Sequence, residues 1–151
     1  MARFTHLLAP DRALWQRFLD LYPGRYLSID YDVRVGSGRD PGPTFSDPLR
    51  SMALSLSQRR IDAIGLASDH IDIIEITLSA GLTALGQLIA YPILYADDFH
   101  PSLPLFPILV CQRMQPDLGH IFASLHINTY ILPPNPIPAS GPRTGPIEGA
   151  R

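Results

Sequence analysis

The sequence contains no lysine, and all 12 of its basic residues are arginine. No chemical step in this chain can therefore use a lysine ammonium group. The 14 acidic residues bring the formal net charge to −2, which gives no overall attraction to nucleic acid or to an anionic membrane. A role in DNA binding would need a local basic patch.

Cysteine and long apolar runs are also scarce. A single cysteine, Cys111, excludes an intramolecular disulfide and a cysteine-rich zinc site. No apolar run reaches the roughly 18 residues of a membrane-spanning helix, and no basic segment followed by an apolar run marks a signal peptide. We therefore expect a protein of the cytoplasm or of a virion, with no membrane partner.

The 151 residues, 46% of them hydrophobic, predict one α/β domain over residues 1–132. Hydrophobic periodicity indicates its elements. These are a helix over 10–22, a strand over 26–35, strands over 59–66 and 71–78, a helix over 80–91 that Pro92 ends or kinks, a strand over 105–112, a short helix over 116–125 and a strand over 126–132. A loop is expected over 36–48, followed by a short helical segment over 49–57.

The remaining residues, 133–151, are rich in proline and glycine and carry few anchoring side chains. Such a composition predicts a C-terminal arm that does not order by itself. Because ordering costs about 1–2 kcal/mol per residue, we expect a partner surface to hold the arm. The arm therefore predicts protein partners in an assembly, and an oligomer.

The two strands at 59–66 and 71–78 are expected to form a hairpin. With the turn centred between Ser68 and Asp69, facing residues have numbers that sum to 137, so Asp62 lies opposite Glu75. The Cβ atoms of such a pair would be roughly 4.5–5.5 Å apart. Two carboxylates this close require a proton or a cation between them, and Mg²⁺ or Mn²⁺ would suit their oxygen ligands. The simpler alternative is two solvated charges at the rim of the sheet.

Alternation predicts which strand residues share a face. In the hairpin, Ile61 and Ala63 are expected on one side, facing Ile76 and Ile74. In the strand over 26–35, one face is expected to hold Leu27, Ile29, Tyr31, Val33 and Val35.

Three segments in this order resemble the PD-(D/E)XK nuclease superfamily, especially its exonuclease-like and Holliday-junction-resolvase-like branches. The segments are Arg60-Ile61-Asp62, Ile73-Ile74-Glu75-Ile76-Thr77 and Gln87-Leu88-Ile89-Ala90-Tyr91. The resemblance covers roughly residues 10–132. It implies a restriction-endonuclease-like core with a mixed sheet: a helix, three antiparallel strands, a helix and a further strand.

The resemblance also implies roles for individual residues. Asp62 and Glu75 match the metal-binding acids, with Mg²⁺ or Mn²⁺ as cofactor, and Gln87 and Tyr91 match a pair on the helix beside the catalytic site. Thr77 stands where the family has its catalytic lysine, and a threonine offers only a neutral hydroxyl.

Two substitutes for the family's groups are open. Arg59 or Arg60 could supply the positive charge, although arginine stays protonated and cannot act as a base. The first helix could contribute through Asp20 or Gln16.

Three functions compete. The first is a nuclease-fold protein with weakened or lost catalysis that acts as a DNA-proximal structural or assembly component, for example in the head–tail connector region of a phage particle. The second is an active Mg²⁺-dependent DNA endonuclease or exonuclease that hydrolyses phosphodiesters. The third is an α/β interaction module with accidental motif matches. The missing lysine favours the first over the second.

Overall fold

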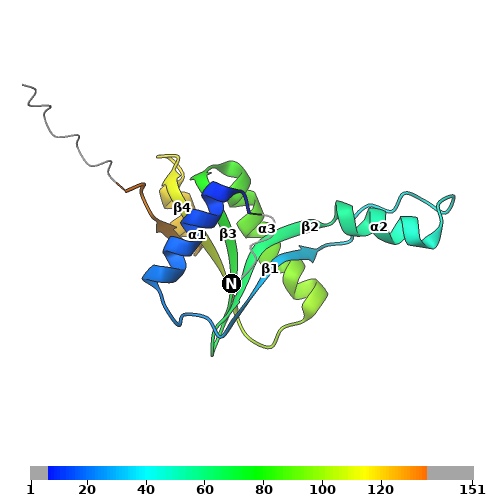
Figure 1. The fold of residues 1–151 in the computed structure, drawn as a ribbon, viewed down its shortest axis with the longest axis horizontal. Coiled ribbons are helices and arrows are strands. Elements are labelled where there is room, and N and C mark those ends of the chain that lie inside the picture. The colour runs from blue at the N-terminus through cyan, green and yellow to red at the C-terminus, as the bar shows by residue number, and fades with distance from the viewer. Residues whose placement is uncertain (1–6, 136–151) are drawn as a thin grey trace, which may run out of the picture.

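The structure is a computed structural model that describes residues 7–135, and within them it shows an α/β fold with a five-stranded mixed sheet and four helices (Figure 1). In chain order the elements are α1 (Ala9–Leu21), β1 (Ser28–Val35), α2 (Asp47–Ser57), β2 (Arg59–Leu66), β3 (Ile71–Ala80), α3 (Leu82–Phe99), β4 (Leu105–Met114), α4 (Gly119–Ser124) and β5 (Asn128–Ile131). All the predicted elements are present, and the predicted α/β class with a mixed sheet is confirmed.

The strands follow the spatial order β1-β2-β3-β4-β5. The first three are antiparallel neighbours, whereas β4 runs parallel to β3 and β5 parallel to β4. A parallel neighbour needs a crossover connection, and α3 supplies it between β3 and β4. The hairpin register predicted from the turn is confirmed for the four pairs from Ala63↔Ile74 to Leu66↔Ile71.

Helices cover both faces of the sheet, α1 on one side and α3 on the other (Figure 1). On the α1 side, Leu14, Trp15 and Phe18 pack against β2, β3 and β4. On the other side, Leu88 and Tyr91 of α3 belong to two clusters that also contain residues of all the first four strands. Because both its faces are covered, seven of the ten residues of β3 are buried, as expected for a central strand.

The predicted single apolar face of β1 is wrong. Ile29 and Tyr31 pack in the α1-side cluster, whereas Val33 and Val35 pack in an α3-side cluster. The reason is Asp32, whose φ of 55° lies in the left-handed region and interrupts the alternation of the strand.

The same change of face occurs in β2, so the expectation that Ile61 and Ala63 share a side is also wrong. Ala63 contacts the α1-side cluster and Ile61 an α3-side cluster. Both ladders are interrupted at Asp62: the β1–β2 pairs continue on either side of it, and the β2–β3 pairs end at Ala63.

Of the two effects predicted for Pro92 on the helix over 80–91, an end of the helix is wrong, because α3 continues through Pro92 to Phe99. Proline removes one backbone hydrogen bond of the helix interior. Packing compensates for this loss, since Tyr91 before the proline and Leu94 after it both contact the core. The helix ends at His100, which has the left-handed φ of 46°.

Between β1 and β2 the chain leaves the body of the protein and projects outward as a loop followed by α2 (Figure 1). We name residues 36–58 the α2 extension. The predicted helical segment over 49–57 is confirmed, and it begins two residues earlier. No residue of α2 is buried, and the exposed large apolar side chains of this region are Phe45, Leu49, Met52 and Leu56.

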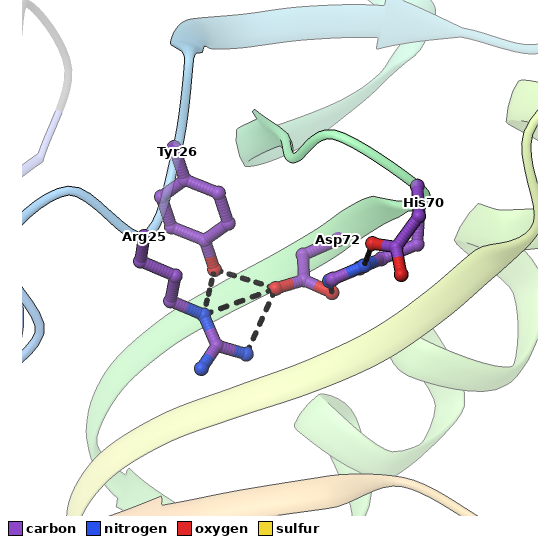
Figure 2. A network of polar contacts seen from close by, with 5 residues as sticks. Arg25, Tyr26, His70 and Asp72 are labelled. Carbon is purple, nitrogen blue, oxygen red and sulfur yellow. Dashed lines mark hydrogen bonds and ion pairs between the residues drawn. The ribbon is translucent and has the colours of Figure 1, made fainter.

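A buried polar network holds the segment between α1 and β1 against the turn end of the β2–β3 hairpin (Figure 2). Asp72 of β3 is only 1% exposed, and its Oδ2 accepts hydrogen bonds from Arg25 Nη2 at 3.0 Å and from Tyr26 Oη at 2.6 Å. His70 Nε2 lies 3.3 Å from the other oxygen, Oδ1. The charge of Asp72 is thus compensated, as a buried carboxylate requires.

In the described residues, no helix combines the length and the hydropathy that crossing a membrane requires. Most of the predicted C-terminal arm, residues 136–151, lies outside the described part. The expectation that a partner in an assembly holds this arm rests on those residues.

Candidate functional site

The two carboxylates predicted to face each other lie together at the centre of the sheet. Asp62 on β2 and Glu75 on β3 are hydrogen-bonded through their carboxyl groups. Asp62 Oδ2 also accepts a hydrogen bond from the backbone N–H of Ile76 at 2.9 Å. The Asp62 side chain therefore accepts the hydrogen bond of a β3 backbone N–H at the point where the regular β2–β3 ladder ends.

Burial changes the ionisation of this pair. Glu75 is only 8% exposed. Burial first, and then the Asp62 charge, raise the pKa of Glu75 to about 9, and burial likewise raises the pKa of Asp62 to about 6. The two groups titrate as a pair, and near neutral pH they share one proton. Either this proton or a cation is needed to keep the carboxyl groups in contact.

Two further aspartates, which the sequence analysis missed, add negative charge around the pair. Asp11 of α1 accepts a hydrogen bond from the backbone of Leu78, and its own pKa is raised by burial. The β1–β2 register places Asp32 opposite Asp62. Both aspartates raise the pKa of Asp62 through their charge. Neither position gives a sequence signal, because Asp32 is one of the alternating polar residues of its strand and Asp11 is an ordinary acidic residue in a first helical turn.

In the first helix, Asp11 is the residue whose charge acts on the pKa of both carboxyl groups of the pair. Gln16 Nε2 donates to Asp20 Oδ1 at 2.9 Å, and this pair lies on the exposed side of α1. Gln16 and Asp20 follow Asp11 by five and nine residues, which at about 100° per residue places them about 140° and 180° around the helix from it.

The predicted pair on the following helix faces the acids. Gln87 Nε2 donates to Tyr91 Oη at 3.1 Å, which fixes the amide. Tyr91 is buried, and its pKa is raised by burial and by the charges of Glu75 and Asp62. The amide oxygen, Gln87 Oε1, is buried and has no hydrogen-bond partner among the described residues.

A cavity of about 380 Å³ opens between the end of β3 and the start of α3. Thr77 lines it together with Glu75 and Gln87. The whole lining consists of Glu75, Thr77, Ser79, Gly81, Leu82, Thr83, Ala84, Gln87 and Gln115, so no side chain there is positively charged.

The two arginines proposed as substitutes for the lysine lie differently. Arg60 Nε is 3.8 Å from Asp32 Oδ1, an exposed and long ion pair. Arg59 lines a second cavity of about 390 Å³ that also contacts Gln87 and Tyr91. Arg59 therefore shares a cavity with residues of the candidate site.

The donor atoms at the site fit a hard divalent ion such as Mg²⁺ or Mn²⁺. Glu75 Oε2 is buried without a hydrogen-bond partner, and the same holds for Gln87 Oε1. Within the described part of the chain, no three His, Cys, Asp or Glu residues come close enough to hold one ion together. Two carboxylates suffice for an ion that keeps several waters or takes phosphate oxygens as ligands.

Comparison with protein-family models, with curated proteins and with solved structures finds no match to this chain. What the fold and the geometry define is an α/β protein with a five-stranded mixed sheet and a buried carboxylate pair at its centre.

Proposed function

We propose that this chain is a nuclease-fold protein of the PD-(D/E)XK type that binds Mg²⁺ or Mn²⁺ beside a DNA strand and hydrolyses DNA weakly or not at all. The observation that carries the proposal is the buried pair of Asp62 and Glu75 beside a cavity that no positive side chain lines. The element order, a helix, three antiparallel strands, a helix and a parallel strand, supports a restriction-endonuclease-like core.

The residues of the chain have different roles at this site. Asp62 is held in place by the N–H of Ile76, and Gln87 is held by Tyr91, so both present fixed oxygens toward Glu75. A bound divalent ion would neutralise the pair and polarise a phosphate oxygen. Thr77 adds a neutral hydroxyl, which cannot stabilise the negative charge of a phosphoryl transition state as an ammonium group does.

The charge distribution supports DNA as the partner. Residues 34–60 contain five arginines and two aspartates, a net charge of +3. The other residues contain seven basic and twelve acidic side chains, a net charge of −5. Because Arg50 is already paired with Asp40, the local basic patch that DNA binding requires consists of the other arginines of residues 34–60.

An active Mg²⁺-dependent DNA nuclease is the second candidate. The observation in its favour is Arg59, whose cavity also contacts Gln87 and Tyr91. This guanidinium could stabilise developing charge where Thr77 cannot, although it cannot accept a proton.

Two measurements test these candidates: metal binding is expected for both, and DNA cleavage separates one from the other. Calorimetric titration with Mn²⁺ should show binding to the wild-type chain and its loss in Asp62→Asn/Glu75→Gln, a nearly isosteric pair of changes. Linear, nicked and branched DNA incubated with Mg²⁺ or Mn²⁺ should remain essentially uncut. Cleavage that disappears in the double variant would establish the active nuclease instead, and absence of metal binding by the wild type would refute both candidates.

A further inference from the structure

A separate polar cavity of about 440 Å³ lies at the base of the α2 extension. Two arginines, Arg39 and Arg59, and two serines, Ser37 and Ser57, contribute to its lining, and no carboxylate does. The cavity is therefore positively charged, and its two guanidinium groups are hydrogen-bond donors, whereas Ser37 Oγ donates to Gly38 O and Ser57 Oγ to Ala53 O. Both properties are those of a site for an oxyanion.

The two arginines of this cavity have no partner within the described residues, unlike others nearby. Arg50 forms an ion pair with Asp40 at 2.5 Å, and Arg60 lies near Asp32. Arg39 and Arg59 are exposed, and the described residues offer neither guanidinium an ion pair or a hydrogen bond. Their charge is thus available to a ligand.

The backbone around the cavity is held in one conformation. Gly36 and Gly38 have φ values of 83° and 67°, which favour glycine, and a Cβ on Gly38 would lie 2.4 Å from the backbone oxygen of Leu54. The N–H of Gly36 donates to Asp98 Oδ2 at 2.8 Å, and Gln58 Nε2 donates to Gly36 O at 2.7 Å. The turn that carries Arg39 is therefore anchored to α3 and to Gln58 at the end of α2.

This cavity connects to the acid pair through a shared lining. Arg59 lines both this cavity and the middle one of about 390 Å³. The middle cavity in turn shares Leu82, Thr83 and Gln87 with the cavity that contains Glu75. A path thus runs across the first turns of α3, with arginines at one end and carboxylates at the other.

We infer that the cavity between Arg39 and Arg59 binds a backbone phosphate of a DNA strand that continues along α3 to the acid pair. The inference rests on the proposed function. It adds a second point at which the DNA strand contacts the protein, besides the acid pair, and the direction in which the DNA strand crosses the protein. The two guanidinium groups would contact only the phosphate, so the contact is independent of base sequence.

Binding of a fluorescent single-stranded oligonucleotide to the full chain, measured at a series of salt concentrations with Mg²⁺ present, tests the inference. Each phosphate contact contributes about 0.7 to the slope of log K against log salt for single strands. Arg39→Ala and Arg59→Ala should each lower the slope by about this amount and weaken binding equally for unrelated sequences. Arg50→Ala, on the same extension but paired with Asp40, is the matched control and should leave the slope unchanged.

The outcomes distinguish this inference from the proposed function. Binding by the wild type with unchanged slopes in Arg39→Ala and Arg59→Ala overturns the cavity as a phosphate site and leaves the proposed function intact. No binding by the wild type overturns both. Amide shifts of Gly36–Arg39 on titration with inorganic phosphate, without any DNA binding, would show a site for free phosphate and would also overturn the inference. Circular dichroism of each variant verifies that it folds.

Discussion

Protonation of Glu75 couples the acid pair to the stability of the fold. Burial and the neighbouring Asp62 charge raise the pKa of Glu75 to about 9, whereas an unfolded chain has the ordinary value of about 4.3. Between these two values the folded chain holds a proton that the unfolded chain has released. Without divalent ions, the free energy of unfolding should therefore fall as pH rises through this window, by up to about 1.4 kcal/mol per pH unit from Glu75 alone, with Asp62 adding to the slope below its pKa of about 6.

Urea unfolding in EDTA across this window measures the effect. Glu75→Gln removes the titrating group, so it should flatten the alkaline part of the slope and stabilise the fold there. Mn²⁺ added to the wild type should stabilise it most at the alkaline end, because the ion replaces the proton. A Glu75→Gln variant with the slope of the wild type would show that the proton resides elsewhere.

Gly65 determines how the Asp72 network assembles. A Cβ at this strand position would lie 2.4 Å from Cε1 of Tyr26, whose ring packs flat on the glycine backbone. Gly65→Ala should move the ring, weaken the 2.6 Å hydrogen bond from Tyr26 to Asp72 and destabilise the fold by about 1–3 kcal/mol. Urea unfolding at neutral pH checks the value.

Gly86 of α3 provides the matched control for that substitution. Nothing lies within 4 Å of a Cβ at this helical position. Gly86→Ala should therefore stabilise the fold by about 0.5–1 kcal/mol, because alanine loses less conformational freedom in a helix. If both variants shifted stability in the same direction, contact with Tyr26 would not explain the effect of Gly65→Ala.

At the scale of the elements, the hairpin was predictable and the irregular strand positions were not. A two-residue turn between two apolar strands allows a single register. The pairs from Ala63↔Ile74 to Leu66↔Ile71 could therefore be predicted by counting residues back from the turn. The change of face at Asp32 does not, since a left-handed aspartate has no periodic signal. The contact between Asp11 and the hairpin depends on how α1 docks, which no local pattern encodes.

The helix α3 shows how tertiary packing overrides a local rule. Pro92 predicts the end or a kink of a helix from sequence, yet α3 extends seven residues beyond it, to Phe99. The additional turns position Asp98, which holds the N–H of Gly36 and so anchors the α2 extension. The candidate acids were thus predictable from spacing, but the geometry of the neighbouring cavity was not.

At the scale of the whole molecule, charge is separated between the α2 extension and the body. The net charge of −2 is the sum of +3 over residues 34–60 and −5 over the other residues. Composition alone argues against DNA binding, whereas the fold brings the basic region next to the carboxylate pair. The steering of a polyanion depends on this local field more than on the total charge.

Removal of the α2 extension tests this division of the molecule. Val35 pairs with Arg59 at the end of the β1–β2 ladder. An Asn-Gly turn replacing residues 37–57 would therefore close a two-residue hairpin. Because α2 buries no residue, the shortened chain should still unfold cooperatively in urea, with nearly the wild-type midpoint. Loss of the cooperative transition would instead show that the extension belongs to the folding core.

The same deletion also predicts a defined change in the salt dependence of DNA binding. It removes Arg39, Arg50, Asp40 and Asp47, so the net charge of the chain stays at −2. Arg50 is already paired with Asp40, which leaves Arg39 as the lost phosphate contact. The salt slope should therefore fall by about 0.7, as in Arg39→Ala, because the slope counts phosphate contacts. A deletion variant with the wild-type slope would place the DNA on the body of the protein and away from the extension.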